Sequence, residues 1–216
     1  MNLSRPISCV VPTLDGPVFE VLARTVQPLT GRQVHRLAGT GSEAGVRKVL
    51  ARLVEQGLVS VTEAGPSLLY VANRAHLSWP AVEVLTSLRK SLLDRLTSLF
   101  PTWDPIPLHV SVFGSAARRD GGMDSDIDLF VLRPEDVGED DEPWAGNVDH
   151  LREHVLAWTG NRCRVFQLDA ARLREHVRAR DPLIDEWQRD AITVHGPAPT
   201  TIVTRLGERR RSRASR

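Results

Sequence analysis

The sequence predicts an α+β fold made of two regions, and three observations support this. Residues 16–76 hold three helical segments followed by two short strand segments around a tight turn. Residues 108–132 hold two strand segments that flank a Gly-Ser turn, a short helix and a Gly-rich loop. Helical and strand segments then alternate up to a Gly-Pro-Ala-Pro run at 196–199. A chain of 216 residues has room for two such regions with a core in each.

The composition is that of an ordinary soluble globular protein, with 41% hydrophobic and 25% charged residues. No apolar run approaches the ~20 residues that a membrane-spanning helix needs. The first residues lack the basic start and apolar stretch of a signal peptide. Cys9 and Cys163 have neither the spacing of a metal site nor that of a disulfide framework. We therefore expect a cytoplasmic protein that does not bind membranes.

The formal net charge of +1 conceals an uneven distribution of charge. Residues 1–78 hold 8 Lys and Arg against 5 acids, residues 79–200 hold 14 against 21, and residues 201–216 hold 6 against 1. This pattern suits basic ends that contact nucleic acid and an acidic middle that collects cations.

The first region contains clear helix signals. Gly16-Pro17 opens the first helix, Thr30 and Gln33 form a capping-box pattern for a second helix through Ala38, and Ser42 is a good N-cap for a third helix that ends before Gly57. The third helix has one apolar face, formed by Val46, Val49, Leu50, Leu53 and Val54. The segments 58–62 and 68–71 then form a hairpin pattern.

Three helices followed by a hairpin resemble the winged helix-turn-helix domains of bacterial regulators, and we assign residues 1–78 to such a domain. The resemblance implies that Arg47, Lys48 and Arg52 of the third helix contact DNA. The alternative is that these three residues form the solvated face of an amphipathic helix, and winged helices also serve as protein–protein adaptors.

Residues 79–100 are predicted to form one long connecting helix, because Pro80 suits its first turn and Pro101 ends it. Its apolar stripe consists of Val82, Leu85, Leu88, Leu92, Leu96 and Leu99. The stripe either packs on the sheet of the second region or pairs with a second subunit in a homodimer.

The most informative stretch runs from Val112 to Leu132. Successive strand residues point to opposite faces, so Asp126 and Asp128 share one face while Ile127 and Leu129 enter the core. Adjacent carboxylates repel each other but suit Mg²⁺, which takes oxygen ligands together with substrate phosphates. Gly114-Ser115, between a strand and a helix, offers backbone N–H groups and a hydroxyl to an anion. The stretch predicts a site for a nucleoside triphosphate and Mg²⁺.

Gly114-Ser115-Ala116-Ala117-Arg118 followed by Ser125-Asp126-Ile127-Asp128-Leu129 resembles the signature of the DNA polymerase β-like nucleotidyltransferase superfamily, and most closely that of the minimal nucleotidyltransferases. The resemblance implies a mixed sheet flanked by helices over residues 101–200. It implies that Asp126 and Asp128 hold two Mg²⁺ ions and that Gly114, Ser115 and Arg118 bind the phosphates. Arg119 stands where the family usually has Gly, so it is either a second phosphate contact or an exposed side chain.

The family also supplies a third carboxylate from a later strand, here Arg162–Leu168. We align Gln167 with that position, and Gln neither acts as a base nor binds Mg²⁺ as strongly as a carboxylate does. Asp169 follows on the same strand face and is the remaining candidate for a catalytic acid. Its alternative role is the N-cap of a helix that starts at Ala170.

The rest of the chain carries weaker signals. The acidic run 135–142 is interpreted as a surface loop, and His150 and His154 as ordinary residues of a helix over 143–158, because no third metal ligand accompanies them. Helical segments over 170–180 and 182–190 and a last strand near 191–194 complete the second domain. The basic tail 201–216 is expected to be disordered and to act as a solubilising tail or a nucleic-acid clamp.

Two functional hypotheses follow from these observations. The first is a Mg²⁺-dependent nucleotidyltransferase that moves a nucleoside monophosphate from an NTP to a hydroxyl of a protein or an RNA; minimal relatives often act in toxin–antitoxin systems. The second is a DNA-binding transcriptional regulator whose nucleotidyltransferase domain only senses nucleotide or is inactive. Gln167 favours the second hypothesis.

Overall fold

The computed structural model describes the backbone of residues 1–214 and the side chains of residues 1–206. The chain divides into two compact units. One consists of Arg5–Lys90, and the other consists of Met1–Ser4 together with the chain from Ser91 onward. The division falls inside a helix rather than at residue 78 or 100. Leu3, near the start of the chain, is buried in the core of the second unit.

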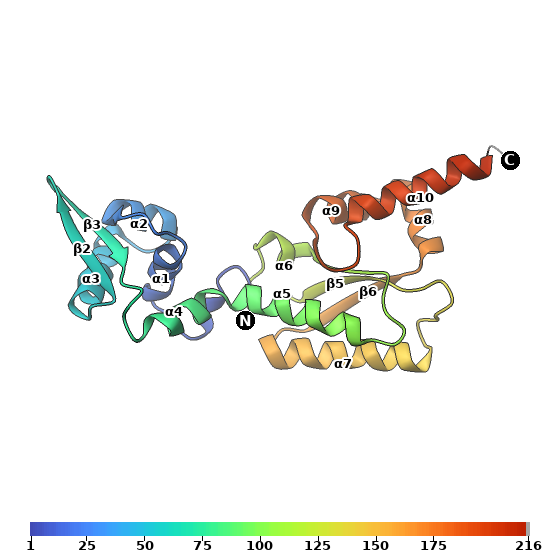
Figure 1. Cartoon of the computed structure of the whole chain (residues 1–216), viewed down its shortest axis with the longest axis horizontal. Helices are drawn as coiled ribbons and strands as arrows, with labels where there is room; N and C mark the ends of the chain where they lie inside the picture. Colours follow the sequence, from blue (N-terminus) through green and yellow to red (C-terminus); the bar gives the residue numbers. More distant parts are fainter. Residues whose placement is uncertain (215–216) are drawn as a thin grey trace. The chain divides into compact units, whose positions relative to one another are not determined.

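The first unit contains helices and a three-stranded antiparallel sheet of order β1-β3-β2. The hairpin of β2 and β3 lies beside the helices (Figure 1). The elements of this unit are η1 (Pro6–Cys9), α1 (Asp15–Ala23), β1 (Leu29–Thr30), α2 (Gly31–Ala38), α3 (Glu43–Glu55), β2 (Val59–Ala64), β3 (Ser67–Ala72) and α4 (Trp79–Thr86). The predicted hairpin is present, and its turn is tighter than expected because β2 and β3 pair up to Ala64 and Ser67.

The local signals of this unit act as the sequence predicts. The Thr30 side chain accepts from the Gln33 N–H, and the Gln33 side chain accepts from the Thr30 N–H, which completes the capping box of α2. The Ser42 hydroxyl accepts from the Gly45 N–H at the start of α3. On α3, Val46, Leu50 and Leu53 are buried in the core of the unit and Val49 and Val54 pack partly against it.

The expected single helix over residues 79–100 is instead two helices, α4 and α5 (Leu88–Leu99), interrupted at Ser87. The Thr86 hydroxyl donates to the Val82 carbonyl and the Ser87 hydroxyl donates to the Val84 carbonyl. Such back-bonding hydroxyls compete with the helical hydrogen bonds and favour a break. The predicted apolar stripe is divided accordingly, because Val82 packs in the core of the first unit and Leu92 and Leu96 in that of the second.

The second unit contains a four-stranded mixed sheet of order β6-β5-β4-β7. β4 (His109–Phe113) pairs antiparallel with β5 (Ile127–Leu132) and with β7 (Ile192–His195), whereas β5 pairs parallel with β6 (Cys163–Leu168). The predicted mixed sheet is therefore present. Its free edges are β6 and β7.

Helices cover both faces of this sheet. α5 and α7 (Glu142–Thr159) lie on one face, and α8 (Ala170–Ala179), α9 (Pro182–Asp190) and α10 (Pro199–Ala214) lie on the other (Figure 1). The alternation along β5 separates the two cores: Ile127, Leu129 and Val131 face α5 and α7, while Phe130 and Leu132 face the other helices. By the same alternation Asp126 and Asp128 belong to the face of α8, α9 and α10.

The structure differs from the expectation that residues 201–216 form a disordered tail. Residues 199–214 form α10, and Ile202 is buried against α9 and the sheet, with Val203 and Leu206 packed beside it. Burial of these apolar side chains offsets the entropy of ordering the segment, which the Arg-rich composition of the tail concealed. Residues 215–216 lie outside the described part of the chain.

No helix among residues 1–214 has both the length and the apolar character that crossing a membrane would require.

Candidate functional site

The candidate site lies where β4 ends and β5 begins. Phe113 at the end of β4 pairs with Asp128 of β5, which places the next residue, Gly114, beside the Asp128 carboxylate. Gly114 adopts a left-handed backbone with φ +63°, and a Cβ atom there would lie 2.7 Å from Asp128 Oδ2. Only glycine satisfies both conditions at low cost. The predicted Gly-Ser turn and the second acid are therefore in direct contact.

The two carboxylates share one side of the sheet, as the sequence predicts. Asp126 immediately precedes β5, and its side chain is 19% exposed. The loop that leads to Asp126 is held by Asn161, whose Nδ2 donates to the carbonyls of Met123 (3.1 Å) and Ser125 (2.9 Å). Asn161 is buried, and its two hydrogen bonds hold this loop against the residues that precede β6. No local pattern in the sequence indicates this positioning role of Asn161.

Ser115 lies at the start of the short helix α6 (Gly114–Arg118), against the Gly-rich loop. A Cβ atom on Gly121 would lie 3.1 Å from the Ser115 hydroxyl and 3.2 Å from the Ser125 side chain. The Ser125 hydroxyl in turn accepts from the Gly122 N–H at 2.8 Å. The small residues of the loop thus allow it to close tightly over the turn that carries Ser115.

Arg118 and Arg119 follow at the end of α6, and both are exposed. Arg118 is held by two acids, because its Nε donates to Asp120 at 3.0 Å and its Nη1 lies 3.9 Å from Asp190. Arg119 adopts a left-handed backbone with φ +65°. Glycine would adopt this conformation without steric cost, so the arginine backbone is less favourable here than a glycine backbone would be.

Arg164 is a second site residue that the sequence alone did not indicate, and it lies beside the acids. It lies directly opposite Asp128 in the parallel pairing of β5 with β6, and its Nε lies 2.7 Å from Asp126 Oδ2. The signal was present in the alternation of β6, where Arg162 and Arg164 alternate with the apolar Cys163 and Val165. Without the register between the two strands, however, the sequence does not show which residue stands level with the acids.

The electrostatics of the pair depend on burial and on Arg164. Partial burial raises the pKa of the Asp128 carboxyl above its usual range, the Arg164 guanidinium lowers it in part, and the charge of Asp126 raises it further. Cys163 faces the other side of the sheet, where burial raises the pKa of its thiol to about 12. The thiol is therefore protonated and is not a nucleophile here.

Gln167 and Asp169, the expected third-acid positions, are not brought to the pair. By the alternation of β6, Gln167 points to the sheet face opposite that of Asp126 and Asp128. There it accepts from Trp144 Nε1 at 2.5 Å. Asp169 lies five residues beyond Arg164, about 16 Å along the strand direction. Its side chain accepts from the Arg172 N–H and caps α8, which was its alternative role.

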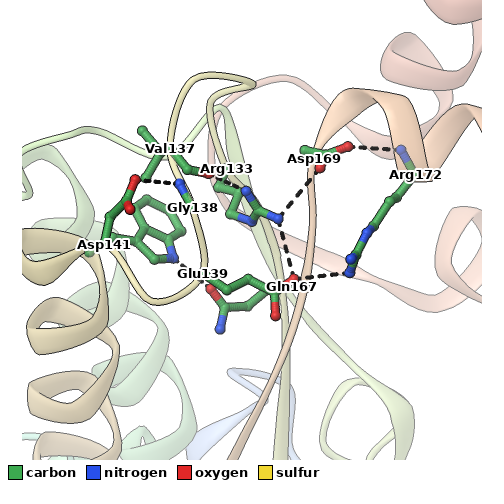
Figure 2. A network of polar contacts seen from close by, with 9 residues as sticks. Arg133, Val137, Gly138, Glu139, Asp141, Gln167, Asp169 and Arg172 are labelled. Atoms are coloured by element: carbon green, nitrogen blue, oxygen red, sulfur yellow. Dashed lines mark hydrogen bonds and ion pairs between the residues drawn. The ribbon is translucent and has the colours of Figure 1, made fainter.

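These two residues belong to a polar network at the far end of β5 and β6, drawn in Figure 2. Arg133, with a side chain only 7% exposed, lies 3.3 Å from Glu139 and 3.4 Å from Asp169 and donates to the Val137 carbonyl. Glu139 also accepts from Arg172 at 3.2 Å. A cavity of about 450 Å³ opens beside this network, lined by Glu139, residues 165–168, Arg172, Glu175 and His176. The acid pair of the candidate site is not part of its lining.

The donor set of the acid pair fits one Mg²⁺ ion. Mg²⁺ is commonly held by one or two carboxylates together with substrate phosphates and water. Asp126 and Asp128 supply two carboxylates beside the Gly-Ser turn. Within the described residues no group of three or more His, Cys, Asp or Glu side chains converges as metal ligands. A second ion would therefore lack a further carboxylate.

In the first unit, the residues expected to contact DNA lie on the exposed side of α3, and two of them form ion pairs. Arg47 lies 2.5 Å from Glu43 within the helix, and Arg52 pairs with Asp15 of α1. Lys48 is exposed. A groove of about 700 Å³ lies between α2, α3 and the hairpin, and Arg32, Glu43 and Arg47 are the charged residues of its lining.

The Gly-Ser turn thus faces two carboxylates at the start of the next strand of a mixed sheet. Residues 89–193, which contain this turn and both carboxylates, match the family model of the nucleotidyltransferase domain. The matched segment begins in α5 and ends in β7, so it contains every residue of the candidate site. The match supports the nucleotidyltransferase superfamily for this domain and a transferase class for its activity. Comparisons with curated proteins and with solved structures find no match.

Proposed function

We propose that the protein is a Mg²⁺-dependent nucleotidyltransferase that moves a nucleoside monophosphate from an NTP to a hydroxyl acceptor. The observation that carries this proposal is the contact between Gly114 and Asp128, where a Cβ would meet the carboxylate oxygen at 2.7 Å. A backbone so close to a carboxylate puts a phosphate-binding turn and a metal-binding acid within reach of one triphosphate.

Each residue has a defined task in this proposal. The backbone at Gly114 and Ser115 and the Ser115 hydroxyl bind the β- and γ-phosphates, and Arg118 adds a cation after exchanging Asp120 for phosphate. Asp126 and Asp128 would hold Mg²⁺ against the same phosphates. When bound, this ion neutralises charge that develops on the triphosphate.

The transfer is a displacement at the α-phosphorus. The acceptor oxygen forms a bond to the α-phosphorus, the bond from that phosphorus to the α,β-bridging oxygen breaks, and pyrophosphate leaves. The hydroxyl proton passes to water. The main contribution of the protein is positioning, because phosphoryl chemistry needs little covalent help from side chains. By resemblance to minimal nucleotidyltransferases, the acceptor is a Ser, Thr or Tyr of a protein or an RNA end, and a toxin–antitoxin setting fits such an activity.

Labelled NTPs test this proposal. Incubating the full chain with each NTP, Mg²⁺ and a cell extract should give label transfer that Asp126→Ala and Asp128→Ala each reduce at least about a hundredfold. Asp149→Ala on α7 is the matched control, because it removes an exposed carboxylate that pairs only with Arg152 across one helical turn. Equal transfer by the acid-pair variants and the control would refute the catalytic assignment.

A second function, DNA binding by the first unit, is favoured by its arrangement of elements. Three helices, a hairpin after the third helix and a short strand that joins the hairpin resemble the arrangement of a winged helix domain, which supports this proposal. The basic side chains of α3 and the groove beside it are then the surface for the duplex. The protein would be a transcriptional regulator that responds to nucleotide.

Gel shifts with genomic fragments test the second function, and salt dependence separates phosphate contacts from base contacts. Arg47→Ala and Lys48→Ala should weaken binding at least tenfold. Arg52→Ala should do so with some loss of stability, because Arg52 also pairs with Asp15. Glu55→Ala on the same helix is a suitable control. Binding that shows no preference among fragments would count against a regulator.

A further inference from the structure

Arg164 is placed beside the two carboxylates by strand pairing alone. It stands level with Asp128 across the parallel β5–β6 pair, and its Nε lies 2.7 Å from Asp126 Oδ2. Side chains that stand opposite each other on adjacent strands point to the same face. The guanidinium therefore lies on the acid side of the sheet, and it comes from an edge strand that leaves it room to move.

The fold does not need this ion pair. The Arg164 side chain is 76% exposed, and ion pairs at such exposure contribute little to stability. The contrast with Arg133 is direct, since that side chain is 7% exposed and is held by two acids and a carbonyl. An exposed arginine that contacts a partly buried carboxylate affects the charge of the site more than the packing of the domain.

We infer that Arg164 acts as the second cation of the site: it pairs with Asp126 in the absence of nucleotide, and it moves to the triphosphate when one divalent ion binds Asp126 and Asp128. This inference rests on the proposed function, because it describes how the same site binds metal and nucleotide. It gives the site a stoichiometry of one divalent ion for each nucleotide.

The charges support this arrangement. Among the described residues, the pair does not belong to any group of three or more His, Cys, Asp or Glu side chains that could hold a metal ion. One divalent ion and one guanidinium together carry three positive charges, which balance much of the charge of a triphosphate and two carboxylates. A guanidinium about 5 Å from a divalent ion lowers the affinity for that ion by a factor of roughly ten even in bulk water. Arg164 should therefore oppose metal binding until phosphate oxygens attract its guanidinium away from Asp126.

Manganese titrations test the inference with a readout that does not depend on turnover. Mn²⁺ binding to the full chain is measured by electron paramagnetic resonance or calorimetry, first with Mn²⁺ alone and then with a non-hydrolysable NTP analogue. For Mn²⁺ alone, Arg164→Ala should bind about tenfold tighter than wild type. Arg174→Ala is the matched control. Arg174 lies on α8 at the other end of the sheet, 2.5 Å from Glu135 of the loop after β5, so its substitution removes the same charge from an ion pair away from the acids.

With the analogue present, wild type should bind one Mn²⁺ ion, and Arg164→Ala should bind the analogue about tenfold more weakly. Arg164→Asp places a carboxylate level with Asp128 and should bind two Mn²⁺ ions. Arg164→Glu repeats this test if the first variant is poorly folded.

Three results would overturn the inference. They are equal Mn²⁺ affinity for Arg164→Ala and Arg174→Ala, two ions in wild type with the analogue, and an unchanged affinity of Arg164→Ala for the analogue. An analogue that fails to bind wild type at all would instead remove the proposed function. The titration with Mn²⁺ alone would then still show whether Arg164 competes with the ion for Asp126. If neither wild type nor Arg164→Ala binds Mn²⁺, that result counts against the inference.

Discussion

The two ends of the β5–β6 pair use the same residue types for opposite purposes. At one end, Asp126 and Asp128 meet Arg164, whose side chain is 76% exposed. At the other end, Glu139 and Asp169 meet Arg133, whose side chain is 7% exposed. The buried arginine and its acids connect a strand, a loop and the start of α8. The ion pair of the exposed Arg164 with Asp126 contributes little to the stability of the fold.

This difference indicates that residue type does not separate a structural carboxylate from one available to a ligand. The strand face of the carboxylate, and the hydrogen bonds and ion pairs it already makes, separate the two. Asp169 already accepts a backbone N–H and pairs with Arg133. Asp128 lies beside a glycine that leaves its carboxylate accessible, and burial raises its pKa. Mutations at the two ends should therefore separate loss of stability from loss of nucleotide binding.

The largest effect on stability is expected for Arg133→Met. Removing one partner of a buried charge pair typically costs about 3–5 kcal/mol, because the remaining acids lose their cation. Urea unfolding should show a loss of roughly 3 kcal/mol, at the low end because Glu139 and Asp169 are partly exposed. Nucleotide affinity of the folded protein should stay unchanged. Arg174→Ala, which breaks an exposed pair at the same end, should cost less than about 1 kcal/mol.

A comparable effect should appear on acidification through His109, which lies buried at the start of β4, level with Leu132 of β5. Its Nδ1 bonds to the Pro197 carbonyl (2.7 Å) and its Nε2 to Ser111 Oγ (2.9 Å), and burial lowers the pKa of the ring to about 4. The unfolded chain takes up a proton near pH 6.5 and the folded chain only near pH 4, so folding stability should fall as the pH drops through this window.

The size of the loss should approach 3 kcal/mol at pH 4, because each unit of pKa difference corresponds to about 1.4 kcal/mol. Urea unfolding at pH 7, 5.5 and 4.5 measures it. His109→Gln should lose this pH dependence, whereas His150→Gln, an exposed residue of α7, should retain it. A stability that stays constant across the window in wild type would contradict the assignment.

The acid-pair end is tested by Gly114→Ala. Its φ of +63° is unfavourable for alanine, and the added Cβ would lie 2.7 Å from Asp128 Oδ2. The left-handed conformation alone costs roughly 1–2 kcal/mol. The displaced carboxylate should also lower affinity for an NTP analogue with Mn²⁺ at least tenfold. Gly122→Ala is the control from the adjoining loop, because nothing lies within 4 Å of its added Cβ. Equal affinity in the two variants would mean that Asp128 does not hold the metal.

Signals that act over a few residues were predictable from the sequence. The capping box of Thr30 and Gln33, the Ser42 cap and the alternation that places Asp126 with Asp128 all involve near neighbours. Arg164 was not predictable, because its place beside Asp126 depends on the register of two strands that are 36 residues apart in the chain. In the same register, Gln167 points to the sheet face opposite the acid pair, and Asp169 lies at the other end of the sheet.

The break between α4 and α5 and the extent of α10 could not be predicted from the sequence either. The break at Ser87 depends on hydroxyl groups whose rotamers compete with the helix, and the apolar stripe across it looks continuous in sequence. The first turns of α10 depend on Ile202, Val203 and Leu206 finding a core made by α9 and the sheet. A local hydrogen-bond competition decided the first case, and a tertiary contact decided the second against the local composition.

The smallest effect is expected for Asp169→Ala, and it bears most directly on how the two ends differ. Loss of an N-cap typically costs about 1 kcal/mol, and Asp169→Asn should cost less because asparagine caps equally well. Neither variant should change label transfer, because Asp169 lies about 16 Å along the sheet from Asp128 and is engaged by Arg133 and by the start of α8. If Asp169 were a third catalytic carboxylate, Asp169→Ala and Asp169→Asn would both abolish label transfer, although Asp169→Asn would retain the stability of the wild type. Measuring transfer and unfolding on the same three proteins therefore determines whether the far end of the sheet contributes to the chemistry or only holds β6 and α8 together.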